Sequence, residues 1–139
     1  MLFRSGGCYA LLLLDADYFK QVNDNHGHDV GDMALIRLGQ AFRGALRQED
    51  VCSRWGGEEF LALLIEANLT AAATVATRTL EACRAIGIPC EERMVRITAS
   101  IGIAAHQPGE TYAETLRRAD EALYMAKRQG QDRFALAQQ

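Results

Sequence analysis

The sequence predicts a single α/β (α+β) domain, a ferredoxin-like β-α-β-β-α-β sheet with its helices on one face and an extra helix and strand at the C-terminal end. Apolar runs of strand length alternate with longer segments whose apolar residues recur at helical spacing. Two of the strand-like runs flank a Gly-Gly pair, as in a β-hairpin. The 139 residues are enough for one buried core and contain no internal repeat, so we expect residues 1–139 to be one domain.

The N-terminal third is expected to form a strand and a long helix. Residues 1–7 are irregular, and their Gly-Gly pair suggests a linker. Residues 8–14 are a continuous apolar run, which predicts a central strand buried on both faces. Residues 17–28 are polar with one short helical turn, and residues 29–47 carry an apolar stripe of helical period.

A hairpin and a second helix follow in the middle of the chain. Residues 51–53 and 60–65 are β-prone, and the Gly-Gly pair at 56–57 is expected to take positive φ angles in a tight turn between them. Residues 68–86 then place apolar side chains on one helical face, after an Asn or Thr able to cap the helix.

The C-terminal third predicts a strand, a third helix and a short edge strand. Residues 94–105 alternate between apolar and polar side chains, which indicates one long strand. Thr111 is expected to start the third helix, and Gly130 to follow its end as the C′ residue. Residues 133–137 are long enough for an edge strand.

Composition and charge narrow the class of protein. The chain is 49% hydrophobic and 24% charged, and no run approaches the length of a membrane span. A net charge of −3 argues against general binding of nucleic-acid polymers or membrane surfaces. The cysteines lack metal-binding spacing and mostly lie in apolar stretches, so we expect buried free thiols in a cytoplasmic domain, which could also be the output domain of a larger sensor. They are Cys8, Cys52, Cys83 and Cys90.

Carboxylates gather where the predicted strands end. Asp15 and Asp17 follow the buried first strand, and Glu58 and Glu59 follow the Gly-Gly pair. In a β-α-β-β-α-β sheet the first strand lies beside the hairpin, so Asp15 and Glu58 are expected to face each other. Such oxygen ligands suit Mg²⁺, which binds a few carboxylates together with substrate phosphates. The alternative is a solvated turn whose charges serve only solubility.

Basic residues are placed where phosphates would need them. Lys20 lies five residues beyond Asp15, and Lys127 and Arg128 end the third helix. Their charges could offset the charge that develops during phosphoryl transfer. A GxxxxGK[ST] loop is absent from the sequence, which excludes a P-loop enzyme. Metal-assisted nucleotidyl transfer of the two-metal type therefore fits these residues.

Five stretches of the chain resemble GGDEF-domain diguanylate cyclases, in the variant that reads GGEEF, in the family's order and spacing. They are residues 15–20 (DADYFK), 23–32 (NDNHGHDVGD), 56–60 (GGEEF), 98–102 (TASIG) and 118–127 (RADEALYMAK). The resemblance implies a fold related to nucleotidyl cyclases and polymerase palm domains. It also implies condensation of two GTP into cyclic di-GMP with release of pyrophosphate, by a head-to-tail homodimer whose subunits hold one GTP each.

The resemblance also assigns roles around the carboxylates. It implies that Asp15, the carbonyl of Ala16 and Glu58 bind Mg²⁺ or Mn²⁺. Glu58 or Glu59 is expected to assist removal of the 3′-hydroxyl proton, and Lys20 is counted with them as catalytic.

Further residues are expected to bind the substrate. On the family's pattern Lys20 and Lys127 hold phosphates, while Asn23 and Asp32 read guanine. A carboxylate accepts from N1–H and the exocyclic amine of guanine, and an amide pairs with O6 or N3, so the chemistry agrees. Phe19 and His28 lie on the same segment, although a histidine beside a helix start is more often structural.

A second constellation resembles the family's RxxD inhibitory site. Arg47 and Asp50 stand just before the hairpin, and Arg78 on the second helix could complete the site from the same or a neighbouring subunit. In the family the arginine stacks on and pairs with guanine of the bound product. The alternative is an ordinary solvated ion pair at a helix end.

Two departures from the family's pattern leave a rival function open. The usual Asp-x-Leu-Thr segment and helix before the first strand are not seen in residues 1–7, and Gln131 stands where the family has arginine. Arg128 or Arg133 could replace that cation. The rival hypothesis is a module that binds GTP or cyclic di-GMP without turnover. A third hypothesis is a small ferredoxin-like interaction domain.

Overall fold

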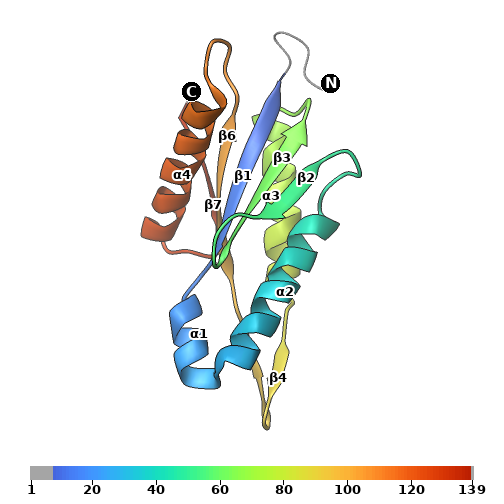
Figure 1. Cartoon of the computed structure of the whole chain (residues 1–139), viewed down its shortest axis with the longest axis vertical. Coiled ribbons are helices and arrows are strands. Elements are labelled where there is room, and N and C mark those ends of the chain that lie inside the picture. The colour runs from blue at the N-terminus through green and yellow to red at the C-terminus, as the bar shows by residue number, and fades with distance from the viewer. Residues whose placement is uncertain (1–7, 139) are drawn as a thin grey trace.

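The computed structural model describes residues 8–138. A five-stranded sheet in the order β2-β3-β1-β6-β7 forms the centre of the molecule, with helices against it (Figure 1). The elements are β1 (Tyr9–Ala16), α1 (Phe19–His26), α2 (His28–Gly44), β2 (Val51–Arg54), β3 (Glu59–Ile65), α3 (Leu69–Arg84), β4 (Ile88–Cys90), β5 (Arg93–Val95), β6 (Ala99–Ala105), α4 (Tyr112–Arg128) and β7 (Phe134–Leu136). The suggestion of a linker at residues 1–7 lies outside the described residues.

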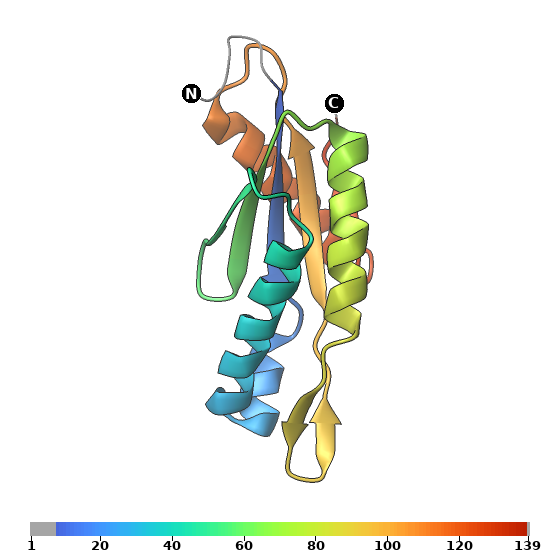
Figure 2. The ribbon, with the colours of Figure 1, turned by 90° about the vertical axis from the view of Figure 1, so that its right-hand side faces the viewer.

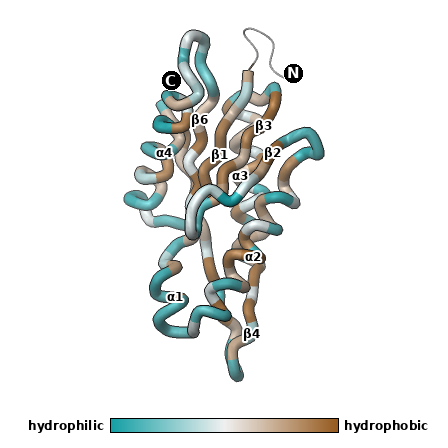
Figure 3. The backbone as a smooth tube through the Cα atoms, in the orientation of Figure 1, coloured by the Kyte–Doolittle hydropathy of each residue, from teal (hydrophilic) through white to brown (hydrophobic). Residues whose placement is uncertain are grey.

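Strand β1 is central and buried on both faces, as predicted. It pairs antiparallel with β3 on one side and with β6 on the other. Because side chains alternate across a strand, Leu12 and Leu14 pack in the core beneath α2 and α3, whereas Leu11 and Leu13 pack with α4 on the opposite face. The expectation of helices on one face is therefore wrong: a strand that is apolar on both faces needs cover on both. In Figure 3 the centre of the sheet is hydrophobic, whereas α1 is largely hydrophilic.

Helix α4 packs directly on β6 through a glycine. A Cβ atom on Gly102 would lie 2.1 Å from the carbonyl oxygen of Ala119 and 2.3 Å from the backbone nitrogen of Leu123. No side chain larger than hydrogen fits there without moving α4. Gly102 therefore sets how closely the C-terminal helix approaches the sheet.

The predicted strand at 94–105 is divided in two. Its first part, β5, pairs with β4 in a separate two-stranded sheet that projects beyond the main sheet (Figure 2). Only β6 enters the main sheet, and between them the carbonyl of Thr98 accepts a hydrogen bond from the backbone of Asp17 at 2.9 Å. The alternating pattern runs across this break because Val95 and Ile97 are buried as well.

The hairpin that joins β2 and β3 is wider than expected. Residues 55–58 form its loop, and the glycines of positive φ in the described chain are at 27, 109 and 130, so the pair at 56–57 does not adopt that conformation. Instead, the backbone nitrogens of Trp55 and Gly56 both donate to the carbonyl of Glu59, at 2.7 and 3.3 Å. A Cβ on Gly57 would meet nothing within 4 Å, which leaves the tip open.

The helix ends follow the capping chemistry expected from the sequence. Asn68 caps α3, and its side chain accepts from the backbone nitrogen of Ala71 at 2.9 Å. Thr111 and Glu114 form a capping box at the start of α4, and Gly130 has a φ of 127° just after its end. None of the helices in residues 8–138 is long and apolar enough to cross a bilayer.

The free thiols differ in burial from the prediction. Cys83 is buried, but Cys52 and Cys90 are half-buried and Cys8 is exposed. Residues 51–54 form an edge strand of the sheet, so Cys52 has cover on one side only, and Cys8 precedes β1. The apolar stretches around Cys8 and Cys52 therefore do not imply that the thiols themselves are buried.

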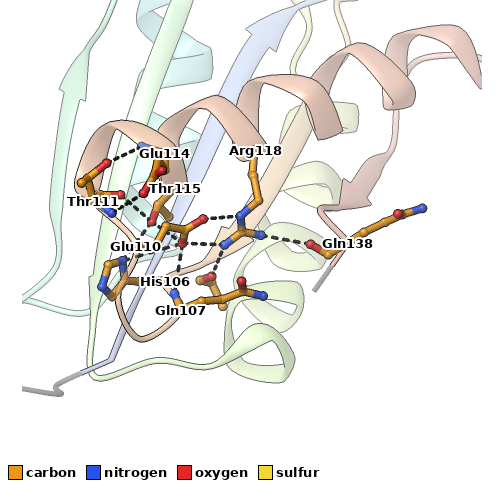
Figure 4. Close-up of polar contacts among 9 residues, drawn as sticks. His106, Gln107, Glu110, Thr111, Glu114, Thr115, Arg118 and Gln138 are labelled. Carbon is orange, nitrogen blue, oxygen red and sulfur yellow. Dashed lines mark hydrogen bonds and ion pairs between the residues drawn. The ribbon is translucent and has the colours of Figure 1, made fainter.

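A polar network fixes the loop that leads from β6 into α4 (Figure 4). Arg118 donates to both carboxylate oxygens of Glu110, at 2.6 and 2.9 Å, and to the carbonyl of Ala105 at 2.6 Å. The hydroxyl of Thr115 donates to the same carboxylate at 2.7 Å. Arg118 and these hydrogen bonds hold the pKa of Glu110 at about 2, below its usual 4.5. The network also reaches the C-terminal end of the chain, because Arg118 donates to the carbonyl of Gln138.

Candidate active site

The end of β1 and the hairpin bring carboxylates together, as the strand order requires. Asp15 lies opposite Glu59 in the β1–β3 ladder, and the backbone nitrogen of Ala16 donates to the carbonyl of Glu58 at 3.2 Å. The side chains of Asp15 and Glu58 are within hydrogen-bonding reach of each other. The expected meeting of Asp15 and Glu58 at neighbouring strand ends is thus present in the structure.

Lys127 enters this acidic cluster from the last turn of α4. Its ammonium lies 3.2 Å from Asp15 Oδ2, 3.1 Å from Asp17 Oδ1 and 3.1 Å from the carbonyl oxygen of Ala16. An ammonium has three N–H donors, and these three acceptors match them. Lys127 is therefore held against the end of β1 by three oxygen acceptors.

The cluster has more negative charge than its cation offsets. Burial raises the pKa of Asp15, although Lys127 opposes this shift. Burial and the neighbouring Asp15 raise the pKa of Glu58, and the same two causes raise the pKa of Glu59. In addition, Asp15 Oδ1 is buried without a hydrogen-bond partner. Buried carboxylates short of donors attract a cation.

The donor set fits a divalent cation that is completed by its ligand. Two carboxylates and a backbone carbonyl at Asp15, Ala16 and Glu58 are hard oxygen donors of the kind that Mg²⁺ and Mn²⁺ prefer. Within residues 8–138, no group of three or more Asp, Glu, His or Cys side chains is arranged to hold a metal. Any metal here would therefore depend on water or phosphate oxygens for the rest of its coordination.

A second group of predicted residues lies along α1 and the start of α2. Asn23 packs against Gly31 so closely that a Cβ there would lie 1.7 Å from Asn23 Oδ1, and Phe19 lies 3.4 Å from the same position. Asn23 Oδ1 is buried and has no partner. The structure thus brings Phe19 and Asn23 together beside Gly31. Asp32 follows Gly31 and is exposed, and His28 is an exposed residue at the first position of α2.

Lys20 lies on the exposed face of α1. Its ammonium pairs with Asp24 at 3.0 Å, in a pair whose side chains are largely in solvent. This contact is local to α1 and separate from the cluster at Asp15. Lys127 is thus the lysine that the structure holds among the carboxylates, and Lys20 would have to leave Asp24 to bind a ligand.

Two of the residues predicted for product inhibition, Arg47 and Asp50, form a hydrogen-bonded ion pair. Arg47 donates to both oxygens of Asp50, at 3.1 and 2.9 Å, and to the carbonyl of Ile65 at 2.6 Å. The Asp50 side chain is fully buried, whereas that of Arg47 is 46% exposed. Arg47 lowers the pKa of Asp50 against the effect of burial. Arg78 reaches the same region from α3, where it donates to the carbonyl of Ala45 at 2.7 Å.

The described residues also form a groove, and the acidic cluster is not part of its lining. It has a volume of about 530 Å³ and lies between α2 and the hairpin strands. Its walls include Leu35, Gly39, Arg54 and Phe60. The carboxylates of Asp15 and Glu58 stand outside it, at the strand ends.

Comparison with known proteins accounts for this combination of residues. The family model described as "Diguanylate cyclase, GGDEF domain" matches residues 2–133 of the 139. The chain belongs to the GGDEF diguanylate cyclase family. Diguanylate cyclase DgcP from Pseudomonas aeruginosa is 40% identical over 134 residues, which are 96% of this chain and 20% of DgcP. Diguanylate cyclase DgcM from Escherichia coli is 39% identical over 129 residues, 93% of this chain and 31% of DgcM.

Solved structures agree with the observed fold of this GGDEF domain. Diguanylate cyclase SiaD from Pseudomonas aeruginosa, in complex with its activator SiaC, is 45% identical with a TM-score of 0.91, over 96% of this chain and 52% of the SiaD chain. The GGDEF domain of DgcB from Caulobacter crescentus, in complex with c-di-GMP, is 30% identical with a TM-score of 0.90, over 95% of this chain and 79% of that chain. The predicted α/β fold class is confirmed. The chain spans a fifth to a third of DgcP and DgcM, its curated relatives.

The turn after α4 of this GGDEF domain contains Gln131, which stands where arginine was expected, and it lies near the arginines considered as substitutes. Gln131 and Asp132 both have positive φ angles, of 63° and 51°, and Gln131 Oε1 is buried without a partner. Arg133 donates to the carbonyl of Gln131 at 3.0 Å and lies over Gly130. Arg128 is engaged with the hydroxyl of Tyr124 at 3.2 Å. Each arginine considered as a substitute for the missing cation therefore has a local partner.

Asp17 is the residue of this site whose contacts the sequence reasoning missed. It is buried, and its carboxylate accepts four hydrogen bonds, all from residues distant in the sequence. Thr98 and Ser100 are among the donors, and both lie in a stretch that the sequence analysis matched to the family. The sequence positions of Asp15 and Asp17 place both carboxylates at the end of β1, but no local pattern marks the donors that Asp17 binds.

Proposed function

We propose that this GGDEF domain condenses two GTP molecules into cyclic di-GMP and pyrophosphate. The observation that carries the proposal is the meeting of Asp15, Glu58 and Lys127 at the end of β1, with one carboxylate oxygen left unpaired. That arrangement offers a cation site beside a fixed ammonium, which is what a triphosphate requires. The activities that their names assign to DgcP and DgcM, as diguanylate cyclases, support the same reaction.

Mg²⁺ or Mn²⁺ would be held by Asp15, Glu58 and the carbonyl of Ala16. The ion would neutralise phosphate charge and polarise the reacting phosphoryl group. Lys127 adds a positive charge on the side of the cluster that faces α4. Lys20 is exposed on α1, where it pairs with Asp24. It is proposed to leave Asp24 and to pair with the phosphates when the nucleotide binds.

Proton removal from the 3′-hydroxyl is assigned to the glutamates of the hairpin. Burial and the nearby Asp15 raise the pKa of both Glu58 and Glu59, which makes each carboxylate a stronger base once it is ionised. Glu58 is proposed to share the cation with Asp15, which leaves Glu59 freer to accept the proton. The GGEEF form of the hairpin thus supplies two carboxylates with different tasks.

Guanine is proposed to bind between α1 and the start of α2. The unpaired Oδ1 of Asn23 is an acceptor that needs a donor, and guanine carries N–H groups at N1 and N2. Asp32 would accept from the same edge, and the ring of Phe19 would form an apolar wall. His28 is exposed at the start of α2 and is assigned a minor contact at most.

Two copies of the domain are needed for the reaction. One site holds one GTP, and each 3′-hydroxyl must attack the α-phosphate of the other nucleotide. A head-to-tail homodimer that apposes two such sites meets this requirement. Residues 1–139 form one catalytic GGDEF domain in this proposal.

Product is proposed to bind at Arg47, Asp50 and Arg78. The hydrogen-bonding edge of Arg47 is occupied by Asp50 and Ile65, so its contribution would be the exposed flat face that stacks on guanine. Asp50 is buried and would act by fixing Arg47. Cyclic di-GMP is the ligand named for the related DgcB structure, which supports product binding by a domain of this fold.

A second function is favoured by one observation at the turn after α4. Gln131 brings no positive charge, and its side-chain amide oxygen, Oε1, is buried without a partner. A domain with too few phosphate-binding cations could bind GTP or cyclic di-GMP and act as a sensor without turnover. Incubation with GTP and Mg²⁺, followed by separation of the nucleotides, distinguishes the two functions. Cyclic di-GMP and pyrophosphate indicate the cyclase, and bound but unconverted GTP indicates the sensor.

A further inference from the structure

We propose that Asp17 is a positioning residue that keeps Lys127 in the phosphate site when a divalent cation occupies Asp15. The inference rests on the proposed function for the identity of the ligand, but its geometry concerns this chain alone. Asp17 and Asp15 both contact the ammonium of Lys127, at 3.1 and 3.2 Å. A cation held by Asp15 and the carbonyl of Ala16, as proposed above, would compete with Lys127 for both of these groups, and of its three acceptors Asp17 would then be left to hold the lysine.

The carboxylate of Asp17 has no capacity left for a metal ion. Its Oδ1 accepts from Ser100 Oγ at 2.8 Å and from Lys127 Nζ at 3.1 Å. Its Oδ2 accepts from Thr98 Oγ1 at 2.7 Å and from the backbone nitrogen of Asp132 at 2.9 Å. With both oxygens doubly occupied and the side chain fully buried, Asp17 is excluded as a ligand for an ion that arrives from solvent.

The other donors to Asp17 come from chain segments before and after Lys127 in the sequence. Thr98 precedes β6 and Ser100 lies within it, while Asp132 follows α4 by a turn whose residues have positive φ angles. Asp17 therefore ties the C-terminal end of α4 to the end of β1, and Lys127 is the charged group at that junction. A buried carboxylate in so many hydrogen bonds is rigid, so it fixes the ammonium more closely than Asp15 does.

The test is a double-mutant cycle on binding of α,β-methylene GTP, which cannot be turned over, in the presence of Mg²⁺. We expect Asp17→Asn to weaken binding about tenfold, as for the loss of one charge-assisted contact, and to have less than a twofold effect in a Lys127→Met background. A loss of similar size in both backgrounds would overturn the inference, because Asp17 would then act through the fold. No loss in a folded Asp17→Asn variant would overturn it as well.

Two additional measurements separate positioning from stability and from the proposed function. Arg84→Gln removes a contact to the same turn, at Asp132, without touching Lys127, so it should lower the melting temperature but leave analogue binding unchanged. In the native chain, the side-chain ¹⁵N resonance of Lys127 should persist when Mg²⁺ alone saturates Asp15, and its loss would overturn the inference even if Asp17→Asn did not fold. Failure of the native chain to bind the analogue contradicts the proposed function, while this resonance still decides the role of Asp17.

Discussion

Replacement of Glu110 by glutamine tests the network that anchors α4. Lowering a pKa from 4.5 to about 2 corresponds to about 3 kcal/mol of preference for the ionised side chain in the folded chain. The side chains of Arg118 and Glu110 remain 18% and 11% exposed, so solvent screens part of this preference. We therefore expect Glu110→Gln to reduce the free energy of unfolding by about 2 kcal/mol at pH 7.

The pH dependence of this loss identifies its cause. Because the folded-state pKa lies below the unfolded value, the stabilisation is present above pH 4.5 and disappears as the pH falls toward 2. Urea unfolding of the native chain and of Glu110→Gln between pH 7 and 3 should therefore give curves that converge at low pH. Glu114→Gln is the matched control, since a glutamine there can still accept the capping-box bond from Thr111. A difference that stays constant with pH, or one as small as that of the control, would refute the argument.

Three predictions concern the proposed reaction. Asp15→Asn should abolish formation of cyclic di-GMP while leaving the circular dichroism spectrum unchanged, and product formed at the native rate would exclude Asp15 as a metal ligand. Asp32→Ala should remove the preference for GTP over ATP in competition binding, at a cost of roughly 1–3 kcal/mol for GTP; an unchanged preference would assign guanine recognition elsewhere. Arg47→Ala should weaken cyclic di-GMP binding at least about tenfold by calorimetry, and Arg47→Lys should not restore it, because lysine has no flat face; equal affinities would mean that Arg47 and Asp50 are a structural pair only.

The parts of the fold that the sequence predicts well are those set by local patterns. The apolar run at 8–14 and the helical stripe at 29–47 gave elements of the right type, because burial and period are properties of neighbouring residues. The break between β5 and β6 was missed because both sides of it are apolar and buried, so alternation continues while the hydrogen-bonding partner changes. The loop at 55–58 was missed because a Gly-Gly pair permits a tight turn without requiring one.

The same distinction applies to the site. Asp15 and Glu58 were predicted to meet because strand order determines which strand ends are adjacent. The contacts of Asp17 were not, since its hydrogen bonds to Thr98 and Asp132 span 81 and 115 residues of sequence. Nothing local marks such a partner. From the sequence, a carboxylate two residues from Asp15 could be a second metal ligand or a buried hydrogen-bond acceptor. The number of hydrogen-bond donors around Asp17 in the structure distinguishes these two roles.

Two acidic clusters in this domain differ in how fully their charges are compensated. At the loop before α4, Arg118, Thr115 and the backbone nitrogen of Gln107 donate to Glu110, and the pKa of that carboxyl is lowered to about 2. At the end of β1, Lys127 alone faces several carboxylates, and the pKa values of Asp15, Glu58 and Glu59 are raised. A raised folded-state pKa means that stability is lost as the pH rises through it, so the second cluster opposes folding at neutral pH unless a cation binds.

This contrast separates the part of the molecule that maintains the fold from the part that is proposed to bind ligand. Because a divalent cation would relieve the repulsion only where the carboxylates are ionised, its stabilising effect should grow as the pH rises above their ordinary range. The cluster at Glu110 has no such deficit and gains nothing from a cation. On the proposed function, the uncompensated carboxylate cluster at the end of the central strand is one half of a site, and the metal and the triphosphate would supply the other half.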